Sequence, residues 1–366
     1  APMLYNVGII IGTVWFTGGV NLFGWQIFDG GIMGVALGVV LGSFLQLIVS
    51  AVGLAGLGFD YNFKIYWRNK GFRKVLSLLP ARSVDQGMDY VVSLVEVNLA
   101  SRLADGTVRA YQQALTLHMM PINLIGVAIS NAAFPQLTEH LGEGRNDLFQ
   151  KDLRSLLRII FWMALPVSVV IFFTRGYVVH FIRNGGNQLI AGILGCLVVA
   201  ILFRTIYHMA ARAFYARQDT KTPLYISIFS ITLNIILAIV LSMVLKMGAY
   251  GLAWAQSTVA VLEVVVLLAV MNRQMPKLFD MTFVRAIFKM IIAGTITGVV
   301  CYIAVLIMPF RYHDDSFFSA FPKFVIISLV SFGAYAAASK WLELPEIDPI
   351  LARLKKVLFG RLEFKG

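Results

Sequence analysis

Ten apolar blocks constrain this chain more than any other feature of its sequence. A helix needs about 20 apolar residues to cross the ~30 Å hydrocarbon core of a bilayer. In lipid, each backbone polar group must find its partner within the segment, so such blocks predict helices. We place ten membrane spans at approximately 2–20, 31–53, 75–100, 108–134, 155–174, 188–215, 223–245, 249–271, 284–308 and 320–342.

The composition agrees with a membrane protein. Hydrophobic residues make up 58% of the chain and charged residues 14%, against about 25% charged residues in a soluble domain. The net charge of +12 is spread over short loops instead of one patch, so nucleic acid is not an expected partner. The sequence has no P-loop, no Gly-x-Ser-x-Gly and no His-Glu-x-x-His motif, which gives no sign of ATP hydrolysis or hydrolytic chemistry.

The loop charges predict the orientation of the chain, because Lys and Arg accumulate in cytoplasmic loops. If the N-terminus is cytoplasmic, the inside loops and tail hold 22 Lys and Arg residues. The outside loops then hold six, namely Arg102, Arg109, Arg175, Arg183, Lys246 and Arg311. We therefore expect both ends of the chain to be cytoplasmic.

An internal repeat links the first two spans to spans seven and eight. Gly31-Ile-Met-Gly34-Val-Ala36 recurs 217 residues later as Gly248-Ala-Tyr-Gly251-Leu-Ala253. The preceding spans also begin alike, with Pro and Tyr near their starts. Spans three to eight then form a six-helix unit, and spans one and two form the end of an earlier unit without its first four helices. Two repeated lobes around a midplane cavity are typical of transporters.

Span three carries the most charge. Asp85, Asp89 and Glu96 are spaced by four and seven residues, so they share one helix face. Ionisable groups inside the membrane are costly and mark functional sites. One interpretation is the wall of a wet cavity with a carboxylate that binds H⁺ or Na⁺; the other, for Arg82 and Asp85, is a pair that joins helices. Asn234 in span seven is either a second ligand or an interhelical hydrogen-bonding group.

Span six carries Arg204, His208 and Arg212 at intervals of four, which form one continuous stripe. Guanidinium groups bind phosphate oxygens in a bidentate way, so a stripe facing a cavity suits a pyrophosphate. The alternative is that Arg204 pairs with a carboxylate of another helix. In span four, Gln112 and Thr116 are also four residues apart and therefore form a polar face.

Three stretches carry a resemblance to a known family. They are Phe214-Tyr-Ala-Arg-Gln-Asp-Thr-Lys-Thr-Pro223, Pro121-Ile-Asn-Leu-Ile-Gly-Val-Ala128 with the following Phe134-Pro-Gln-Leu137, and Leu99-Ala-Ser-Arg-Leu-Ala-Asp-Gly106. In these, over about residues 1–340, the chain resembles the MurJ family of lipid II flippases. That family belongs to the multidrug/oligosaccharidyl-lipid/polysaccharide exporter superfamily.

The resemblance implies an all-α integral membrane protein of two lobes plus two extra helices, with the first lobe truncated here. The cargo would be lipid II or another undecaprenyl-pyrophosphate-linked glycan, carried across the bacterial cytoplasmic membrane for peptidoglycan and cell wall biogenesis and hence cell shape. The protein would be a transporter and not an enzyme. Alternatives are a polysaccharide or drug exporter of the same superfamily and a non-transporting scaffold.

The resemblance also implies roles for single residues. An arginine essential in the family falls at Thr116, so that charge is absent, and Arg204 is the nearest substitute. The expected substrate-binding residues are Arg204, His208, Arg212, Arg82, Thr116 and Gln112. The expected ion-coupling residues are Glu96, Asn234 and Asp89, with Na⁺ or H⁺ as the coupling ion and a Na⁺ site at Glu96 and Asn234.

We accordingly divide the chain into five parts. They are the last two helices of the N-terminal lobe (1–56), a basic cytoplasmic linker (57–74), a six-helix C-terminal lobe (75–271), two helices forming a groove for the lipid tail (272–342), and a basic cytoplasmic tail (343–366).

Overall fold

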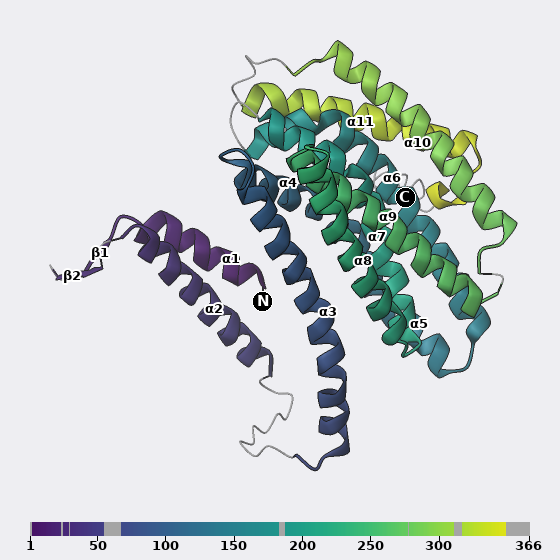
Figure 1. Ribbon diagram of the computed structural model, residues 1–366, viewed down its shortest axis with the longest axis horizontal. Coiled ribbons are helices and arrows are strands. Elements are labelled where there is room, and N and C mark those ends of the chain that lie inside the picture. Colours follow the sequence, from purple (N-terminus) through teal and green to yellow (C-terminus); the bar gives the residue numbers. More distant parts are fainter. Residues whose placement is uncertain are drawn as a thin grey trace, which may run out of the picture. The chain divides into compact units, whose positions relative to one another are not determined.

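The computed structural model describes residues 2–22, 25–28, 30–54, 67–182, 187–276, 278–310 and 317–348. The side chains of residues 2, 20–22, 25–28, 54, 71, 74, 75, 77–89 and 182 lie outside the described part. The described chain is almost wholly helical (Figure 1).

The elements follow in chain order. They are α1 (Pro2–Ile11), the π-helix η1 (Gly12–Phe16), β1 (Val20–Leu22), β2 (Trp25–Phe28), α2 (Ile32–Leu54), α3 (Lys70–Ser101), α4 (Thr107–Pro121), the π-helix η2 (Ile122–Val127), α5 (Ala128–Gly142), α6 (Asn146–Ile182), α7 (Gln188–Ala216), α8 (Lys221–Ile239), the π-helix η3 (Val240–Val244), α9 (Ala249–Gln274), α10 (Met281–Ile307), α11 (Phe317–Trp341) and the 3₁₀ turn η4 (Pro345–Ile347).

The expected all-α membrane fold is confirmed. In the described residues, eight helices are long and apolar enough to cross a membrane, and two shorter apolar helices cover Met3–Phe16 and Tyr90–Ser101. Large side chains such as Leu124 and Phe318 remain 76% and 84% exposed. In water such surfaces would be unfavourable, whereas acyl chains solvate them.

The chain divides into two compact units, Ala1–Lys74 and Val75–Gly366. In the first unit, α1 packs antiparallel to α2 through glycines. A Cβ added to Gly8 would lie 2.3 Å from the Cα of Gly42, and one added to Gly12 would lie 2.5 Å from the Cα of Gly38. These two helices therefore approach with backbone against backbone, as small residues allow in membranes.

The repeat in the sequence has a counterpart in local structure. Both α1 and α8 end in a π-helical turn, and both following helices start after a glycine with positive φ, Gly31 at 65° and Gly248 at 58°. Three residues further on, Gly34 and Gly251 face the backbone of Phe16 and Leu241, which belong to the two π-turns. In both helical hairpins, a glycine near the start of the second helix thus packs directly against the backbone of the π-turn that precedes it.

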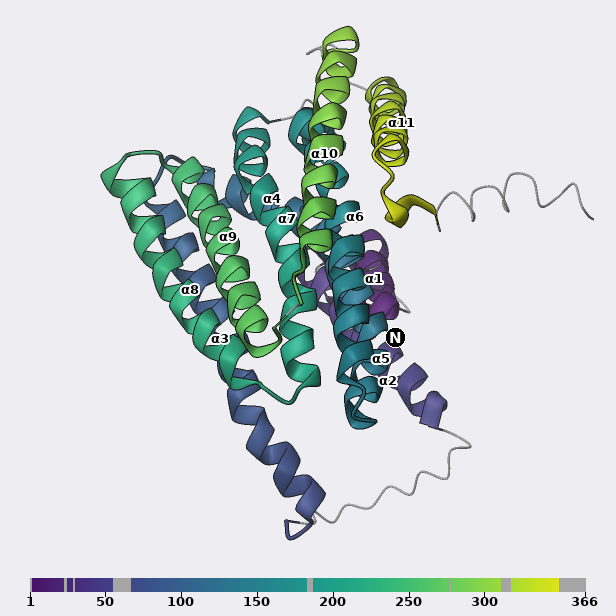
Figure 2. The ribbon, with the colours of Figure 1, turned by 90° about the vertical axis from the view of Figure 1, so that its right-hand side faces the viewer.

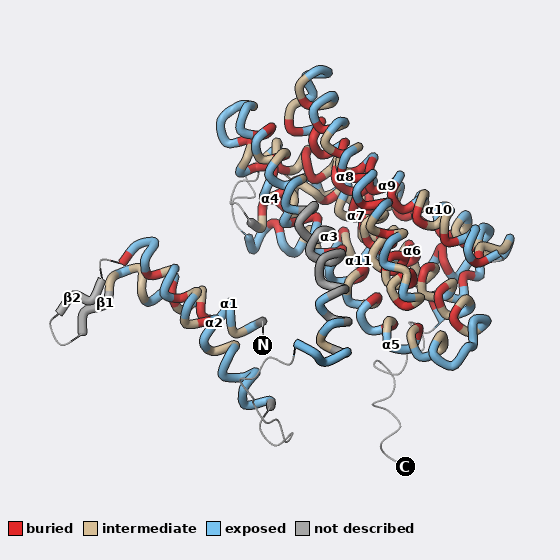
Figure 3. Tube along the Cα trace, turned by 60° about the horizontal axis from the view of Figure 1, so that its bottom comes forward, coloured by how far each residue is buried: buried red, intermediate tan, exposed pale blue. Residues whose placement is uncertain are grey.

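In the second unit, α7 is the central helix. It packs against α4, α6 and α9 and carries a nearly continuous buried face, while α10 and α11 pack against each other and against α6 (Figure 2). The indole Nε1 of Trp162 on α6 donates a hydrogen bond to Ser339 Oγ on α11, 3.0 Å away. Buried residues concentrate where α6, α7 and α9 meet (Figure 3).

Two local features differ from the expected elements. The helix α3 begins at Lys70 and not at residue 75, so the end of the expected linker 57–74 is helical. Between α1 and α2, the segments Val20–Leu22 and Trp25–Phe28 pair as an antiparallel hairpin where only a loop was expected. Both features lie outside apolar helical blocks, where hydropathy carries no signal.

Candidate functional site

A buried polar layer crosses the second unit, and α9 supplies two of its members. Gln256 and Glu263 are seven residues apart, so they lie on one face of α9, two turns from each other. Glu263 is only 3% exposed. Glu263 points toward α7 and α8, the helices that pack against α9.

Glu263 forms an ion pair with Arg204 of α7. The guanidinium Nη1 lies 2.7 Å from Glu263 Oε2, and the Arg204 side chain keeps 28% of its surface exposed. The other carboxylate oxygen lies 3.5 Å from Ser227 Oγ of α8, which also contacts the Tyr207 hydroxyl at 3.1 Å. The alternative in which Arg204 pairs with a carboxylate of another helix is therefore the arrangement found.

Glu96 of α3 is the second buried carboxylate, 2% exposed. The amide Nε2 of Gln256 donates to Glu96 Oε1 at 2.9 Å, which joins α3 to α9 across 160 residues of sequence. The Arg204 guanidinium also acts electrostatically on Glu96. The layer thus contains two carboxylates, Glu96 and Glu263, and one arginine that acts on both.

Helix α8 lines the same layer with small polar groups. Ser227, Ser230 and Asn234 are all buried, and their spacing of three and four places them on one helix face. Among the described residues, neither the oxygen nor the nitrogen of the Asn234 amide has a hydrogen-bond partner. A buried amide without hydrogen-bond partners lowers the stability of the fold. A ligand or water molecule that hydrogen-bonds to Asn234 would therefore stabilise this position.

Four more of the expected substrate-binding residues lie on α4 and on the second half of α7. Gln112 and Thr116 are exposed on α4, and the Thr116 hydroxyl donates to the Gln112 carbonyl at 2.9 Å. His208 and Arg212 are half-buried on α7, where the Arg212 guanidinium lies 5.8 Å from the centre of the Phe134 ring. Arg204, His208 and Arg212 therefore do follow one stripe, but only Arg204 belongs to the buried layer.

The side chains of Arg82 and Asp89 lie outside the described residues, although their backbone belongs to α3. Sequence reasoning did not identify Glu263 as a residue of the site. Its signal was a carboxylate inside an apolar block, which is by itself a reason for attention. In the described part of the chain, no three His, Cys, Asp or Glu side chains are grouped so that they could hold a metal ion.

Hydrogen bonds made by Asp219 explain the sequence motif at Phe214–Pro223, in the loop between α7 and α8. Asp219 Oδ1 accepts from the Thr222 backbone N–H at 3.0 Å, and Asp219 Oδ2 accepts from the Thr222 hydroxyl at 2.6 Å. Burial raises the pKa of the Asp219 carboxyl, but these hydrogen bonds outweigh burial and hold the pKa below its ordinary value. Arg217 Nη1 then joins the loop to Gln274 Oε1 of α9 at 2.6 Å.

Ionisable groups held at membrane depth on several helices, in a multi-pass bundle with a repeated helical hairpin, define a membrane transporter. The comparisons with known proteins agree. The sequence pattern of the family described as "Lipid II flippase MurJ" matches residues 1–321. The chain therefore belongs to the MurJ family, whose members are flippases and not enzymes.

Relatives match over much of this chain. A probable lipid II flippase MurJ of Borreliella burgdorferi is 26% identical over 263 residues, 70% of this chain and 50% of the relative. That of Thermotoga maritima is 25% identical over 358 residues, 96% of this chain and 66% of the relative. The chain thus spans about half to two thirds of the length of these relatives.

A solved structure described as lipid II flippase MurJ in an inward closed conformation has a similar fold. The TM-score is 0.68 at 23% identity, over 92% of this chain and 65% of that chain. The likeness supports the helical architecture described above.

Proposed function

We propose that the protein containing this chain moves lipid II across the bacterial cytoplasmic membrane by alternating access, with both ends of this chain in the cytoplasm. It would thereby serve peptidoglycan biosynthesis and cell shape. The family match over residues 1–321 carries this proposal.

The headgroup would contact the stripe on α7. Arg204 keeps 28% of its side chain exposed while it is paired with Glu263. A pyrophosphate that reached this face would compete with Glu263 for the guanidinium, because both present oxygens in a bidentate arrangement. When Arg204 released the Glu263 carboxylate and bound the cargo phosphate instead, the ion pair between α7 and α9 would break. Binding of the cargo would thereby change the packing of α7 on α9.

The exposed polar face of α4 supports an aqueous passage beside α7. Gln112 and Thr116 are exposed on a span where exposed polar groups would otherwise meet acyl chains. The helices α4 and α7 pack against each other. We propose that Gln112 and Thr116 face water together with His208 and Arg212, and that Arg204 supplies the cationic contact that Thr116 lacks.

Glu96 would couple transport to a cation. Glu96 and Glu263 are both buried, and among the described residues one arginine, Arg204, acts on both. A second positive charge, H⁺ or Na⁺, would balance the layer, since buried charges need partners. The Asn234 amide oxygen, which has no hydrogen-bond partner among the described residues, would be a ligand of this cation. Asp89 would be a further ligand.

The polyprenyl tail would lie along α10 and α11, where the two extra helices expose large apolar side chains. A groove of about 410 Å³ lies between the end of α9 and the start of α10. It is lined by Leu268, Ala269 and Asn272 of α9 and by Phe279, Phe283, Val284, Ile287, Phe288 and Ile291. Its apolar walls suit an isoprenoid chain.

Depletion and rescue with the complete gene that encodes this chain tests the proposal. Wild-type protein should restore lipid II on the outer face of cells depleted of their own flippase, measured by cleavage with an externally added lipid II-degrading enzyme. Arg204→Gln and Glu96→Gln should each reduce exposure, whereas the exposed Glu139→Gln should not. Full rescue by a variant carrying both Arg204→Gln and Glu96→Gln would refute the residue assignments.

Failure of the wild type to restore exposure, with normal membrane insertion, would favour the other cargoes. Binding of purified protein to lipid II and to other lipid-linked glycans would then separate a polysaccharide exporter from a scaffold that binds neither.

A further inference from the structure

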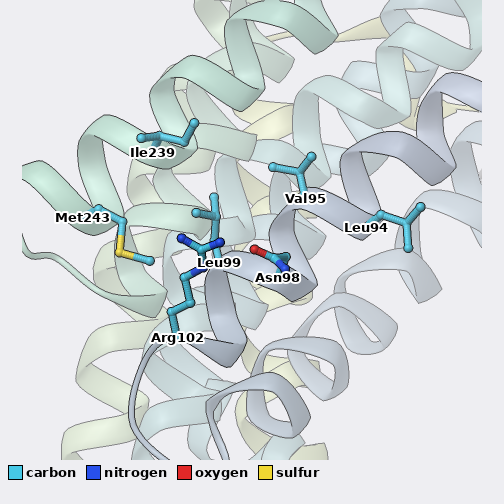
Figure 4. Close-up of a pocket in the computed structure, with 7 residues that line it drawn as sticks. All are labelled: Leu94, Val95, Asn98, Leu99, Arg102, Ile239 and Met243. Carbon is cyan, nitrogen blue, oxygen red and sulfur yellow. The ribbon is translucent and has the colours of Figure 1, made fainter.

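A second surface groove lies between the last turns of α3 and the end of α8, apart from the polar layer. It has a volume of about 670 Å³ and is lined by Leu94, Val95, Asn98, Leu99, Arg102, Ile239 and Met243 (Figure 4). Leu94 is 71% exposed and Ile239 is 42% exposed, so its walls are open and apolar.

The polar end of the groove is cationic. Figure 4 shows the Arg102 side chain running back along α3, so that its guanidinium lies beside Asn98 and faces the side of Ile239 and Met243. In the part of the chain that the structure describes, Arg102 makes no ion pair and its side chain donates no hydrogen bond that we observe. Lys246, exposed just after η3, adds a second cation at this end of α8.

The depth of the groove matches a lipid at the membrane surface. Arg102 directly follows the end of α3 at Ser101, and Met243 lies in the last turn of a span that ends at Val244. The apolar walls therefore lie within the span and the guanidinium lies at its end, where headgroup phosphates are found. The π-helical turn η3 widens α8 at this point, and π-turns often accompany functional sites.

We propose that this groove binds an anionic phospholipid at the membrane surface. Its phosphate would accept hydrogen bonds from Arg102 and Asn98, and one acyl chain would lie against Leu94 and Ile239. A guanidinium binds phosphate in a bidentate way, which favours a lipid phosphate over a neutral occupant. The proposal does not depend on the cargo of the transporter.

Native mass spectrometry of the protein released from nanodiscs tests this directly. Nanodiscs of phosphatidylcholine alone and with phosphatidylglycerol provide the two lipid conditions. Wild type should retain phosphatidylglycerol, and Arg102→Gln should retain it about tenfold more weakly, the effect of losing about one charge-assisted contact. Arg109→Gln is the matched control, because Arg109 is also exposed at this end but does not line the groove.

Two further arms separate a lipid from a simple anion. Ile239→Trp should fill the apolar part and weaken phosphatidylglycerol retention while Arg102 is intact. Inorganic phosphate, added to protein in phosphatidylcholine, should not raise the melting temperature as phosphatidylglycerol does. Equal retention by wild type and Arg102→Gln, unchanged retention in Ile239→Trp, or equal stabilisation by free phosphate would each overturn the proposal.

Discussion

Separating Arg204 from Glu263 should destabilise the second unit strongly, and removing both should not. At an effective dielectric constant near 20, unit charges about 4 Å apart attract by roughly 4 kcal/mol, and here the nearest atoms are 2.7 Å apart. Desolvation offsets much of that attraction, but a buried charge left alone costs about 3–5 kcal/mol. For Glu263→Leu we expect about 3 kcal/mol, the low end, because water can reach the partly exposed Arg204.

The double variant Arg204→Met with Glu263→Leu should lose far less than the two single variants combined. We expect a coupling free energy of at least about 2 kcal/mol. The assay is unfolding of the detergent-solubilised protein by dodecyl sulfate, followed by its helical circular dichroism. The exposed pair Arg145–Glu143 is the control and should show less than about 1 kcal/mol. Additive losses at Arg204 and Glu263 would refute the reasoning.

Three further perturbations test the packing. Gly251→Ala places a Cβ 2.6 Å from the backbone carbonyl carbon of Leu241 and should lower the free energy of unfolding by about 1–3 kcal/mol. Gly333→Ala is the control, because nothing lies within 4 Å of the added Cβ, and it should not lower the melting temperature. Equal melting temperatures of the two variants would contradict this packing. Ser339→Ala leaves the Trp162 indole N–H unpaired and should cost about 1–2 kcal/mol in the same melts; an unchanged melt would show that this bond adds no stability. Asp219→Ala should cost about 1 kcal/mol near pH 7. Because the folded pKa of Asp219 is depressed, the difference from wild type should shrink once the pH falls below 3.8 and vanish below the folded pKa. A difference that persists in acid would show that the carboxylate charge is irrelevant.

The membrane helices were largely predictable, because each apolar block has to satisfy its own backbone. The start of α3 at Lys70 was not, since lysine and arginine are good helix formers and the helix continues beyond its apolar part. The hairpin was missed although Trp25–Phe28 is rich in aromatic and β-branched residues, which favour strands.

The candidate site was predictable in its members but not in their pairing. Charge inside an apolar block singled out Glu96 and Arg204. Which side chains contact each other depends on how each helix is rotated about its own axis. The spacing of residues along the sequence does not determine that rotation. The hydrogen bond between Gln256 and Glu96, which are 160 residues apart, could therefore not be predicted from the sequence.

Transport of lipid II by purified protein in liposomes tests the central claim most directly, with Na⁺ and pH gradients imposed separately. Wild type should move lipid II faster under one of these gradients. Glu96→Gln, which can keep the Gln256 contact but removes the charge, should move it at one rate regardless of gradient. Gradient-dependent transport by Glu96→Gln equal to that of wild type would contradict the account.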